Sequence, residues 1–150
     1  MAIEIKKILK EENVVFLDTQ DMKSTIEILS EKAEKIGCIS SKDEFKEAIL
    51  ERESLVSTGI GFGIAMPHAK LDSIDEFFMI IGINENGIDW DAIDRKPVSA
   101  VFLIGGPSNE QKKYLQIIAK LMLLVKNSNR REKLLAAKTA KEVIELFQNF

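Results

Sequence analysis

The sequence predicts a single α/β domain over residues 1–150, in which helices cover both faces of a mixed β-sheet. Two continuous apolar runs of strand length, at residues 77–83 and 98–104, indicate buried central strands. Segments with helical periodicity lie on both sides of these runs along the chain, as is typical of an α/β fold. No repeat, low-complexity stretch or linker divides the chain, and 150 residues with 45% apolar side chains are enough for one domain with a proper core.

The first half of the chain predicts a brief strand followed by two helices. A short amphipathic start over residues 3–10 precedes an extended segment at residues 13–18. The helix after it should end at Gly37, a residue that suits a helix C-cap. Its apolar stripe consists of Met22, Ile26, Leu29, Ala33 and Ile36. Ser41 and Glu44 have the spacing of a capping box, so a second helix should begin there.

The second half of the chain predicts a turn-rich connection, a long helix and two shorter helices. Residues 84–97, between the two apolar runs, are mostly polar and rich in turn-forming residues. The sequence Gly-Gly-Pro-Ser at residues 105–108 ends the second run and leads into the long helix. The apolar stripe of that helix consists of Tyr114, Ile117, Ile118, Leu121, Met122 and Val125. A further helix is expected around residues 130–137, and Thr139 and Glu142 form a last capping box.

Composition and charge argue against several classes of function. The net charge of -3 and the sequence pI of about 5.3, with basic residues spread among acidic ones, make nucleic acid an improbable partner. Cys38 is the only cysteine and His68 the only histidine, so we expect no disulfide and no metal site. The P-loop and dinucleotide fingerprints are missing, and we expect no cofactor. No apolar run approaches the roughly 18 residues of a membrane span, and no apolar leader is visible, so we expect a cytoplasmic protein without direct membrane insertion.

His68 is the most informative residue, because imidazole, with an unperturbed pKa of about 6.5, can be a neutral nucleophile at physiological pH. Gly59, Gly61 and Gly63 alternate before it. If this segment is extended, the glycines leave one face bare, and a bulky anion can approach the backbone N–H groups closely. Pro67 fixes its own φ, so His68 is expected where a strand gives way to a turn. The serine-hydrolase elbow is missing, which leaves His68 itself as the candidate covalent nucleophile.

Residues 58–68, Thr-Gly-Ile-Gly-Phe-Gly-Ile-Ala-Met-Pro-His, resemble the phosphohistidine motif of phosphotransferase-system IIA proteins of the fructose/mannitol and nitrogen-regulatory class. The resemblance extends to Arg-Glu-Ser-Leu at residues 52–55, to residues 87–94 and to the long helix at Leu115, so it covers nearly the whole chain. It implies the mannitol/nitrogen-type IIA fold and a phosphotransferase that works through a covalent phosphohistidine. It further implies that Nε2 of His68 receives a phosphoryl group from the phosphocarrier HPr and passes it to a cysteine of a IIB partner.

Arg52 is the first candidate for a charged group that contacts the phosphoryl oxygens. It lies on the same helical stripe as Phe45 and Ile49, so its stem should run inward. The resemblance also puts an arginine from the Arg-Glu pair at residues 52–53 near the phosphorylated ring. The alternative is an arginine whose head group only reaches solvent.

Uncharged donors for the phosphoryl group are expected around His68. The backbone N–H groups of Gly61 and Gly63 and the hydroxyl of Thr58 could donate to its oxygens, although Thr58 could equally satisfy the backbone of a loop. IIA proteins often carry a second histidine at the start of the long helix, where this chain has Tyr114. Tyr114 can donate one hydrogen bond but cannot become a cation at neutral pH. Because Tyr114 lies on the apolar stripe of the long helix, its ring could equally pack in the core without any role at the site.

Other conspicuous side chains have simpler interpretations. Phe62 lies between two glycines, which favours an exposed ring, and we expect it to belong to a docking surface for a partner protein. Asp89, Asp91 and Asp94 resemble metal ligands but are typical of a solvated, capping turn. Cys38, beside a helix end, is typical of a small buried hydrophobe.

Two functions from different classes follow from these features. One is a phosphocarrier between HPr and a sugar-specific IIB in the uptake of a fructose- or mannitol-like sugar. The other is a regulatory protein of the nitrogen-related kind, whose phosphorylation state controls other proteins. Residues 87–91, Gly-Ile-Asp-Trp-Asp, resemble the sugar branch, whereas Tyr114 and the length of the chain favour regulation. An inactive structural relative would require His68 to be unreactive.

Overall fold

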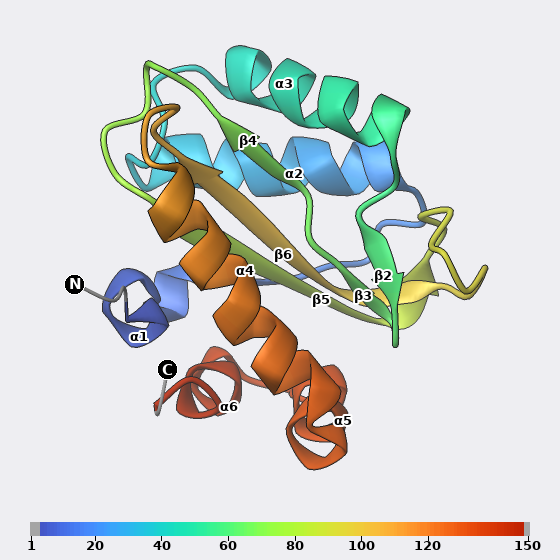
Figure 1. The fold of residues 1–150 in the computed structure, drawn as a ribbon. Helices are drawn as coiled ribbons and strands as arrows, with labels where there is room; N and C mark the ends of the chain where they lie inside the picture. Colours follow the sequence, from blue (N-terminus) through green and yellow to red (C-terminus); the bar gives the residue numbers. More distant parts are fainter. Residues whose placement is uncertain (1–3, 149–150) are drawn as a thin grey trace.

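A computed structural model describes residues 4–148 and contains a six-stranded mixed sheet (Figure 1). In chain order the strands are β1 (Val14–Phe16), β2 (Gly59–Gly61), β3 (Ile64–Ala65), β4 (His68–Lys70), β5 (Phe78–Ile88) and β6 (Val98–Gly106). Their order in the sheet is β1-β5-β6-β3-β2, and β4 pairs with β6 beyond the end of β3. β5 and β6 are antiparallel, β1 runs parallel to β5, and β3 and β4 run parallel to β6. The two apolar runs of the sequence are the central strands, as predicted.

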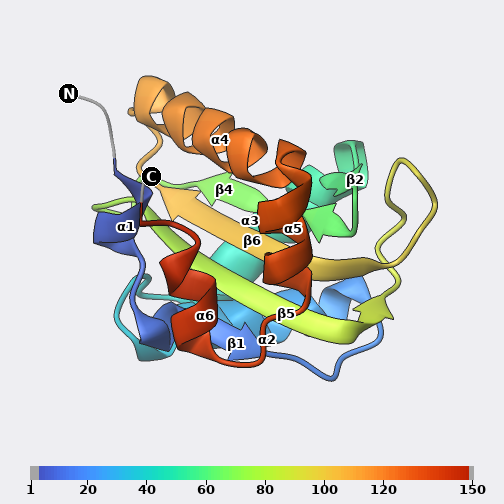
Figure 2. The same cartoon turned by 90° about the horizontal axis from the view of Figure 1, so that it is seen from below.

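Helices cover both faces of this sheet, which confirms the predicted α/β architecture (Figures 1 and 2). The helices are α1 (Ile5–Ile8), the 3-10 turn η1 (Glu11–Asn13), α2 (Met22–Lys35), α3 (Lys42–Leu55), α4 (Gln111–Lys126), α5 (Ser128–Leu135) and α6 (Ala140–Glu145). α2 and α3 pack on one face, and α1, α4, α5 and α6 pack on the other. Within residues 4–148, no helix has the length and apolar character needed to cross a bilayer.

The structure confirms three of the predicted helix boundaries. Two are N-terminal caps with a side-chain hydrogen bond, and one is a glycine in the left-handed conformation after a helix. The Ser41 hydroxyl accepts the N–H of Glu44 at 3.2 Å, and the Thr139 hydroxyl accepts the N–H of Glu142 at the same distance. Gly37 has a φ of +85°, a conformation that costs glycine little, and it follows the end of α2. The local sequence therefore determines where α2 ends and where α3 and α6 begin.

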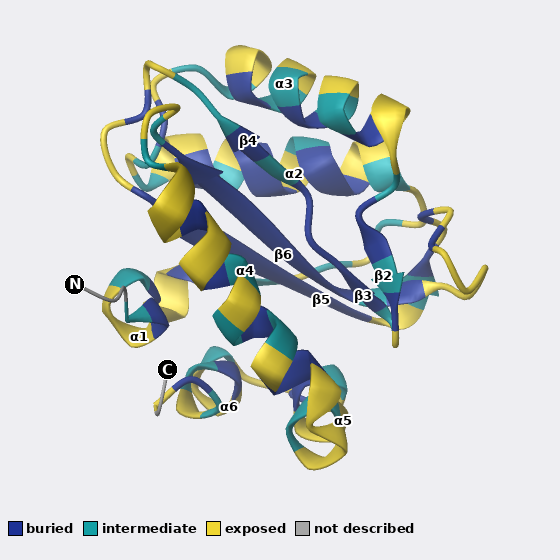
Figure 3. Cartoon of the chain, in the orientation of Figure 1, coloured by how far each residue is buried: buried dark blue, intermediate teal, exposed yellow. Residues whose placement is uncertain are grey.

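Alternation along β6 divides the apolar side chains between two cores. Phe102 and Ile104 belong to the core beneath α4, whereas Val101 and Leu103 belong to the core beneath α2 and α3. Successive side chains of a strand point to opposite faces, so a continuous apolar run supplies both layers. Burial follows the same division, with a buried sheet between helices that bury only their inner sides (Figure 3).

β5 is longer than the apolar run that predicts it. It continues to Ile88 through four residues that the sequence assigned to a turn, and its register with β6 shifts between Ile83 and Ile88. Asn84 is buried there, and its side-chain amide donates to the carbonyl of Thr19 at 2.7 Å. The sequence predicts a turn here because these residues are polar. The irregularity in the register accommodates them within a paired strand.

The glycine-rich segment is a hairpin, so the condition of one extended strand, under which the glycines would leave a bare face, is not met. β2 and β3 are antiparallel, and the chain reverses between them at Phe62 and Gly63. Gly61, Phe62 and Gly63 have φ values of 92°, 60° and 77°, all in the left-handed region. Glycine enters this region without the Cβ clash of other residues, so these glycines make the turn rather than a bare strand face.

Candidate functional site

β4 passes between α3 and the start of α4 (Figures 1 and 2). Side chains of these three elements line a hollow of about 440 Å³. It is lined by Ala48, Glu51, Arg52 and Leu55 of α3, by His68, Ala69 and Lys70 of β4, and by Gln111 and Tyr114 of α4. The structure thus brings together three residues that the sequence separates by up to about sixty positions: Arg52, His68 and Tyr114.

A break in the sheet edge orients the imidazole of His68. Pro67 has no N–H, and its carbonyl accepts the N–H of Ile104 at 2.9 Å, so the chain rejoins β6 only from this point on. His68 is therefore the first residue of β4, not the last residue before a turn as the sequence suggests. The Nδ1 atom lies 3.0 Å from the carbonyl oxygen of Met66. Because a carbonyl only accepts, Nδ1 carries the hydrogen and Nε2 keeps its lone pair.

The surroundings of His68 keep its ring neutral. Burial lowers the pKa of the imidazole, the positive charges of Arg52 and Lys70 lower it further, and the hydrogen bond to Met66 opposes them. The unfolded chain, with an ordinary histidine pKa of about 6.5, takes up the proton first as the pH falls. The contribution of His68 to stability is therefore present above this pH and is lost as the pH falls through the lower pKa of the folded state.

Tyr114 packs against the imidazole of His68. Its side chain is buried, and its ring centroid lies 4.9 Å from that of His68 with an interplanar angle of 43°. Burial raises the pKa of Tyr114 to about 12, against the lowering effect of the Arg52 charge, so the phenol is neutral at physiological pH. The Lys70 ammonium lies 5.0 Å from the centre of the same ring and donates to the side-chain oxygen of Gln111.

Two cationic side chains, Arg52 and Lys70, line the hollow. Arg52 donates from Nη1 to the carbonyl of Val56 at 3.2 Å, just past the end of α3, which fixes the guanidinium while leaving other N–H donors available. Lys70 lies two residues beyond His68 on the same strand and therefore on the same face. Glu51 also lines the hollow. A neutral nucleophile beside an arginine and a lysine is suited to a reaction that transfers an anionic group.

Gly61, Gly63 and Phe62 do not lie at this hollow. They line another one, of about 810 Å³, on the hairpin side of the sheet. Ile64 pairs with Ala100 whereas His68 pairs with Ile104, and four residues of strand span about 13 Å. This placement corrects the expectation that Gly61 and Gly63 donate to a group on His68.

The other predicted residues are placed as follows. Phe62 is 53% exposed, as predicted, but its ring lies 4.5 Å from the guanidinium carbon of Arg131 and not beside His68. Thr58 is buried, and both its N–H and its hydroxyl donate to the carboxylate of Glu53. The hydroxyl therefore binds a side chain and not a loop backbone, and Thr58 does not line the His68 hollow. Asp94 accepts the N–H of Lys96 at 3.0 Å, in keeping with the predicted capping turn.

Comparison with known proteins assigns the family. Residues 7–150 match the family model of the phosphoenolpyruvate-dependent sugar phosphotransferase system, EIIA 2. The chain belongs to this EIIA family. It is 37% identical over 118 residues to the fructose-specific EIIA component of Haloferax volcanii, covering 79% of this chain and 77% of that protein. It is 34% identical over 149 residues to the nitrogen regulatory protein of Klebsiella oxytoca, covering 97% and 90% of the two chains.

Longer relatives and solved structures agree with this assignment. The chain is 31% identical over 130 residues to the fructose-specific EIIABC component of Bacillus subtilis, and it spans only 20% of the length of that protein. The crystal structure of the nitrogen regulatory protein IIA-Ntr from Neisseria meningitidis superposes with a TM-score of 0.89 at 27% identity, covering 96% of this chain and 99% of that one. Both the sugar and the regulatory branch of the EIIA family are thus represented among its relatives.

Two residues that line the hollow, Lys70 and Gln111, were not predicted from the sequence. Lys70 follows His68 at the spacing that places side chains on one face of a strand, so the signal was present. Gln111 precedes Tyr114 by three residues on a helix, which also places the two side chains on one face. Gln111 was hidden because the sequence does not reveal that the start of the long helix packs beside β4, whereas the spacing of Lys70 from His68 could have been used.

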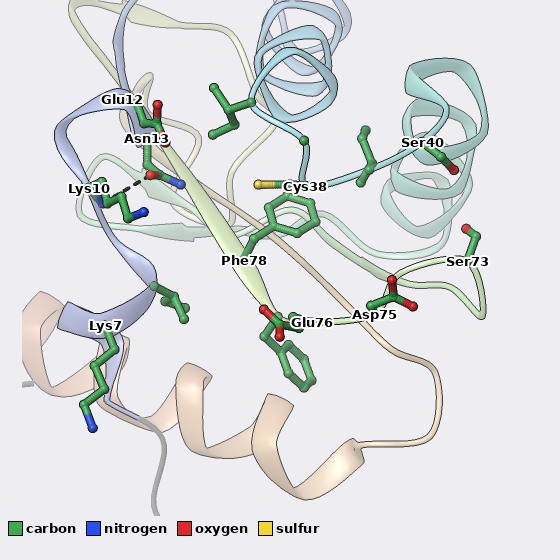
Figure 4. A pocket seen from close by; sticks show the side chains of 15 residues that line it. Lys7, Lys10, Glu12, Asn13, Cys38, Ser40, Ser73, Asp75, Glu76 and Phe78 are labelled. Atoms are coloured by element: carbon green, nitrogen blue, oxygen red, sulfur yellow. Dashed lines mark hydrogen bonds between the residues drawn. The ribbon is translucent and has the colours of Figure 1, made fainter.

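A separate hollow of about 560 Å³ surrounds Cys38, where the chain between α2 and α3 meets η1 and the start of β5 (Figure 4). Burial, together with the charge of Glu12, raises the pKa of the Cys38 thiol. Asn13 accepts the N–H of Lys10 at 3.1 Å and donates to the carbonyl of Met79 at 2.9 Å. A protonated thiol beside a satisfied amide lacks the activated nucleophile that the His68 hollow has.

We expect the imidazole of His68 to titrate below pH 6.5 in NMR spectra of the unmodified protein, where the single histidine gives a single signal. Arg52→Ala should raise the midpoint, because a nearby positive charge that disfavours the imidazolium is lost. The control Lys126→Ala, at the last turn of α4, should leave it unchanged. A wild-type midpoint at or above 6.5 would contradict this account of the site.

Proposed function

We propose that this EIIA protein is a phosphohistidine carrier that accepts a phosphoryl group from HPr on Nε2 of His68 and passes it to a cysteine of a IIB partner. The observation that carries the proposal is the hydrogen bond from Nδ1 of His68 to the Met66 carbonyl, which leaves Nε2 unprotonated at a hollow lined by Arg52 and Lys70. The fructose-specific relatives favour a fructose- or mannitol-like sugar as the end point.

The transfer needs no external base. The Nε2 lone pair attacks phosphorus, the N–P bond in phosphorylated HPr breaks, and the electron pair of that bond returns to the HPr imidazole. His68 keeps its Nδ1 hydrogen, and the Met66 carbonyl stabilises the positive charge that develops on the ring. Attack by the IIB thiolate then forms an S–P bond, breaks the bond to Nε2 and restores the neutral imidazole.

Arg52 and Lys70 act on the charge of the transferred group. During transfer this charge is spread over three equatorial oxygens, so fixed donors beside it stabilise the transition state. The same cations lower the pKa of His68, which keeps the nucleophile unprotonated. Tyr114 contributes a neutral ring and a hydroxyl where IIA proteins often have a second histidine, so the cationic role falls to Arg52 and Lys70.

The docking surface for partners is centred on two exposed leucines that flank the hollow. Leu55 lines the hollow and is 76% exposed. Leu115, 54% exposed, lies one turn after Gln111 on the same side of α4. An apolar centre around a polar site is typical of a protein interface. Phe62, the residue expected from the sequence, lines the other hollow and is outside this surface.

A regulatory role is the second candidate. Its support is the similarity to the nitrogen regulatory protein of Klebsiella oxytoca, which covers 97% of this chain. Both roles use a phosphorylated His68, so they differ in what happens next. Transfer from the phosphorylated protein to the IIB of a fructose or mannitol transporter favours the carrier, whereas retention of the phosphoryl group favours regulation.

The first prediction of the carrier role concerns the site of modification. Incubation with enzyme I, HPr and phosphoenolpyruvate should add one acid-labile phosphoryl group, because His68 is the only imidazole in the chain. Intact-mass analysis at alkaline pH measures it. Modification that persists in His68→Ala would sink the assignment, and Lys126→Ala is the matched control, since its side chain is at the far end of α4.

Removing Arg52 should slow the transfer without unfolding the protein. Loss of one preorganised donor costs about 3 kcal/mol in the barrier, or roughly a hundredfold in rate. Arg52→Lys should recover only part of the rate, because a point charge lacks the fork that matches phosphate. Rapid-quench transfer from phosphorylated HPr, beside urea melts, tests this, with the exposed Arg95→Ala as control. A wild-type rate in folded Arg52→Ala would show that Arg52 plays no part.

Charge placed on the leucine surface should weaken docking. We expect Leu55→Asp to raise the KM for phosphorylated HPr by about tenfold, the loss typical of an important interface residue. The melting temperature should change little, because the side chain is exposed. Leu123→Asp, on a leucine of α4 that is 65% exposed and does not line the hollow, is the matched control. Equal KM values for the two variants would place docking elsewhere.

A further inference from the structure

Glu53 is a buried carboxylate next to Arg52 in sequence, yet it does not line the hollow. Only 8% of its surface is exposed. Its oxygens accept the N–H of Thr58 at 3.3 and 3.1 Å, and the Thr58 hydroxyl donates to the same carboxylate. Burying a charge is costly unless it is hydrogen-bonded, and charge-assisted bonds of this kind are strong and directional. The carboxylate therefore holds Thr58 in one position.

Thr58 connects this carboxylate to the nucleophile through the main chain. Its carbonyl accepts the N–H of Met66 at 3.0 Å, and the Met66 carbonyl in turn accepts Nδ1–H of His68 at 3.0 Å. Thr58 and Met66 are both buried, with 6% and 4% of their surfaces exposed. Three successive links thus join a helix carboxylate to the imidazole, and a displacement of Thr58 moves the carbonyl that selects the tautomer.

We propose that Glu53 is a positioning residue, which through Thr58 and the Met66 main chain holds His68 in the Nδ1–H tautomer with Nε2 available for the phosphoryl group. The kinetic consequence of this proposal rests on the carrier function, whereas its effect on the tautomer does not. Arg52 and Glu53, although adjacent in sequence, then have different roles. Arg52 lines the hollow and faces the transferred group, and Glu53 acts from behind the segment that carries the accepting carbonyl.

The test compares variants that alter the hydrogen bonds between Glu53 and Thr58 while keeping the size and shape of the side chains. Glu53→Gln replaces the charged acceptor, Thr58→Val removes the hydroxyl donor, and Thr58→Ser keeps that donor. Glu47→Gln, an exposed glutamate on the same helix, is the matched control. The first readout is the ¹⁵N spectrum of the His68 imidazole in unphosphorylated protein, which distinguishes the two neutral tautomers. The second is the rate of phosphoryl transfer from HPr, and urea melts report folding.

We expect wild type, Thr58→Ser and Glu47→Gln to show the Nδ1–H tautomer alone. Glu53→Gln and Thr58→Val should show a mixture with the Nε2–H tautomer and a transfer rate lower by about tenfold or more, as is typical when the group that orients a reactive histidine is lost. A purely structural role for Glu53 would instead lower the unfolding midpoint and leave the tautomer unchanged.

The proposal is overturned if folded Glu53→Gln and Thr58→Val keep the wild-type tautomer, or if both variants fail to fold. Should only Glu53→Gln fail to fold, the tautomer in Thr58→Val decides. A tautomer change in a protein whose wild type accepts no phosphoryl group would support the positioning role and reject the carrier function, so the two failures are distinguishable.

Discussion

The edge of β6 is shared by two short strands, and the break between them creates the site. β3 pairs with the first part of β6 and β4 with its last part, because Pro67 cannot donate a ladder hydrogen bond. Met66 lies between these two strands, with both of its polar groups on the side away from β6. Its N–H donates to the carbonyl of Thr58, in register with the β2–β3 pair of Gly59 and Ala65, and its carbonyl accepts the His68 ring N–H. The tautomer of His68 thus depends on a main-chain carbonyl at the edge of the sheet.

The helices packed on the two faces of the sheet supply the side chains that surround His68. β6 ends where α4 begins, and the pairing of His68 with Ile104 places the imidazole beside that junction. Tyr114 at the first turns of α4 packs on the ring, and α3 supplies Arg52 from the other side. The sheet positions His68 and the two helices supply its surroundings. The packing of α3 and α4 on the two faces of the sheet therefore also fixes Arg52 and Tyr114 around the imidazole.

Local signals in the sequence predicted much of this arrangement, and long-range packing was beyond them. The caps at Ser41 and Thr139, the two apolar runs and the motif around His68 are read from neighbouring residues, and each was identified. The conformation of the glycine segment could not be predicted, because alternating glycines fit an extended strand and a tight hairpin equally well. Only the pairing between β2 and β3 distinguishes the two conformations. Similarly, Gln111 lines the hollow only because α4 packs beside β4, which no local pattern encodes.

In the proposed carrier function, the two cations act on His68 in opposite senses before and after phosphoryl transfer. In the unmodified protein, burial and the cations Arg52 and Lys70 all oppose protonation, so the imidazole is available as a nucleophile. Once a dianionic group is attached, the same two cations become attractive partners and offset the cost of burial. Tyr114, with a pKa of about 12, stays neutral throughout and changes neither balance. In a carrier of this kind, with no second histidine in the chain, we expect the balance between accepting and releasing the phosphoryl group to depend on Arg52 and Lys70.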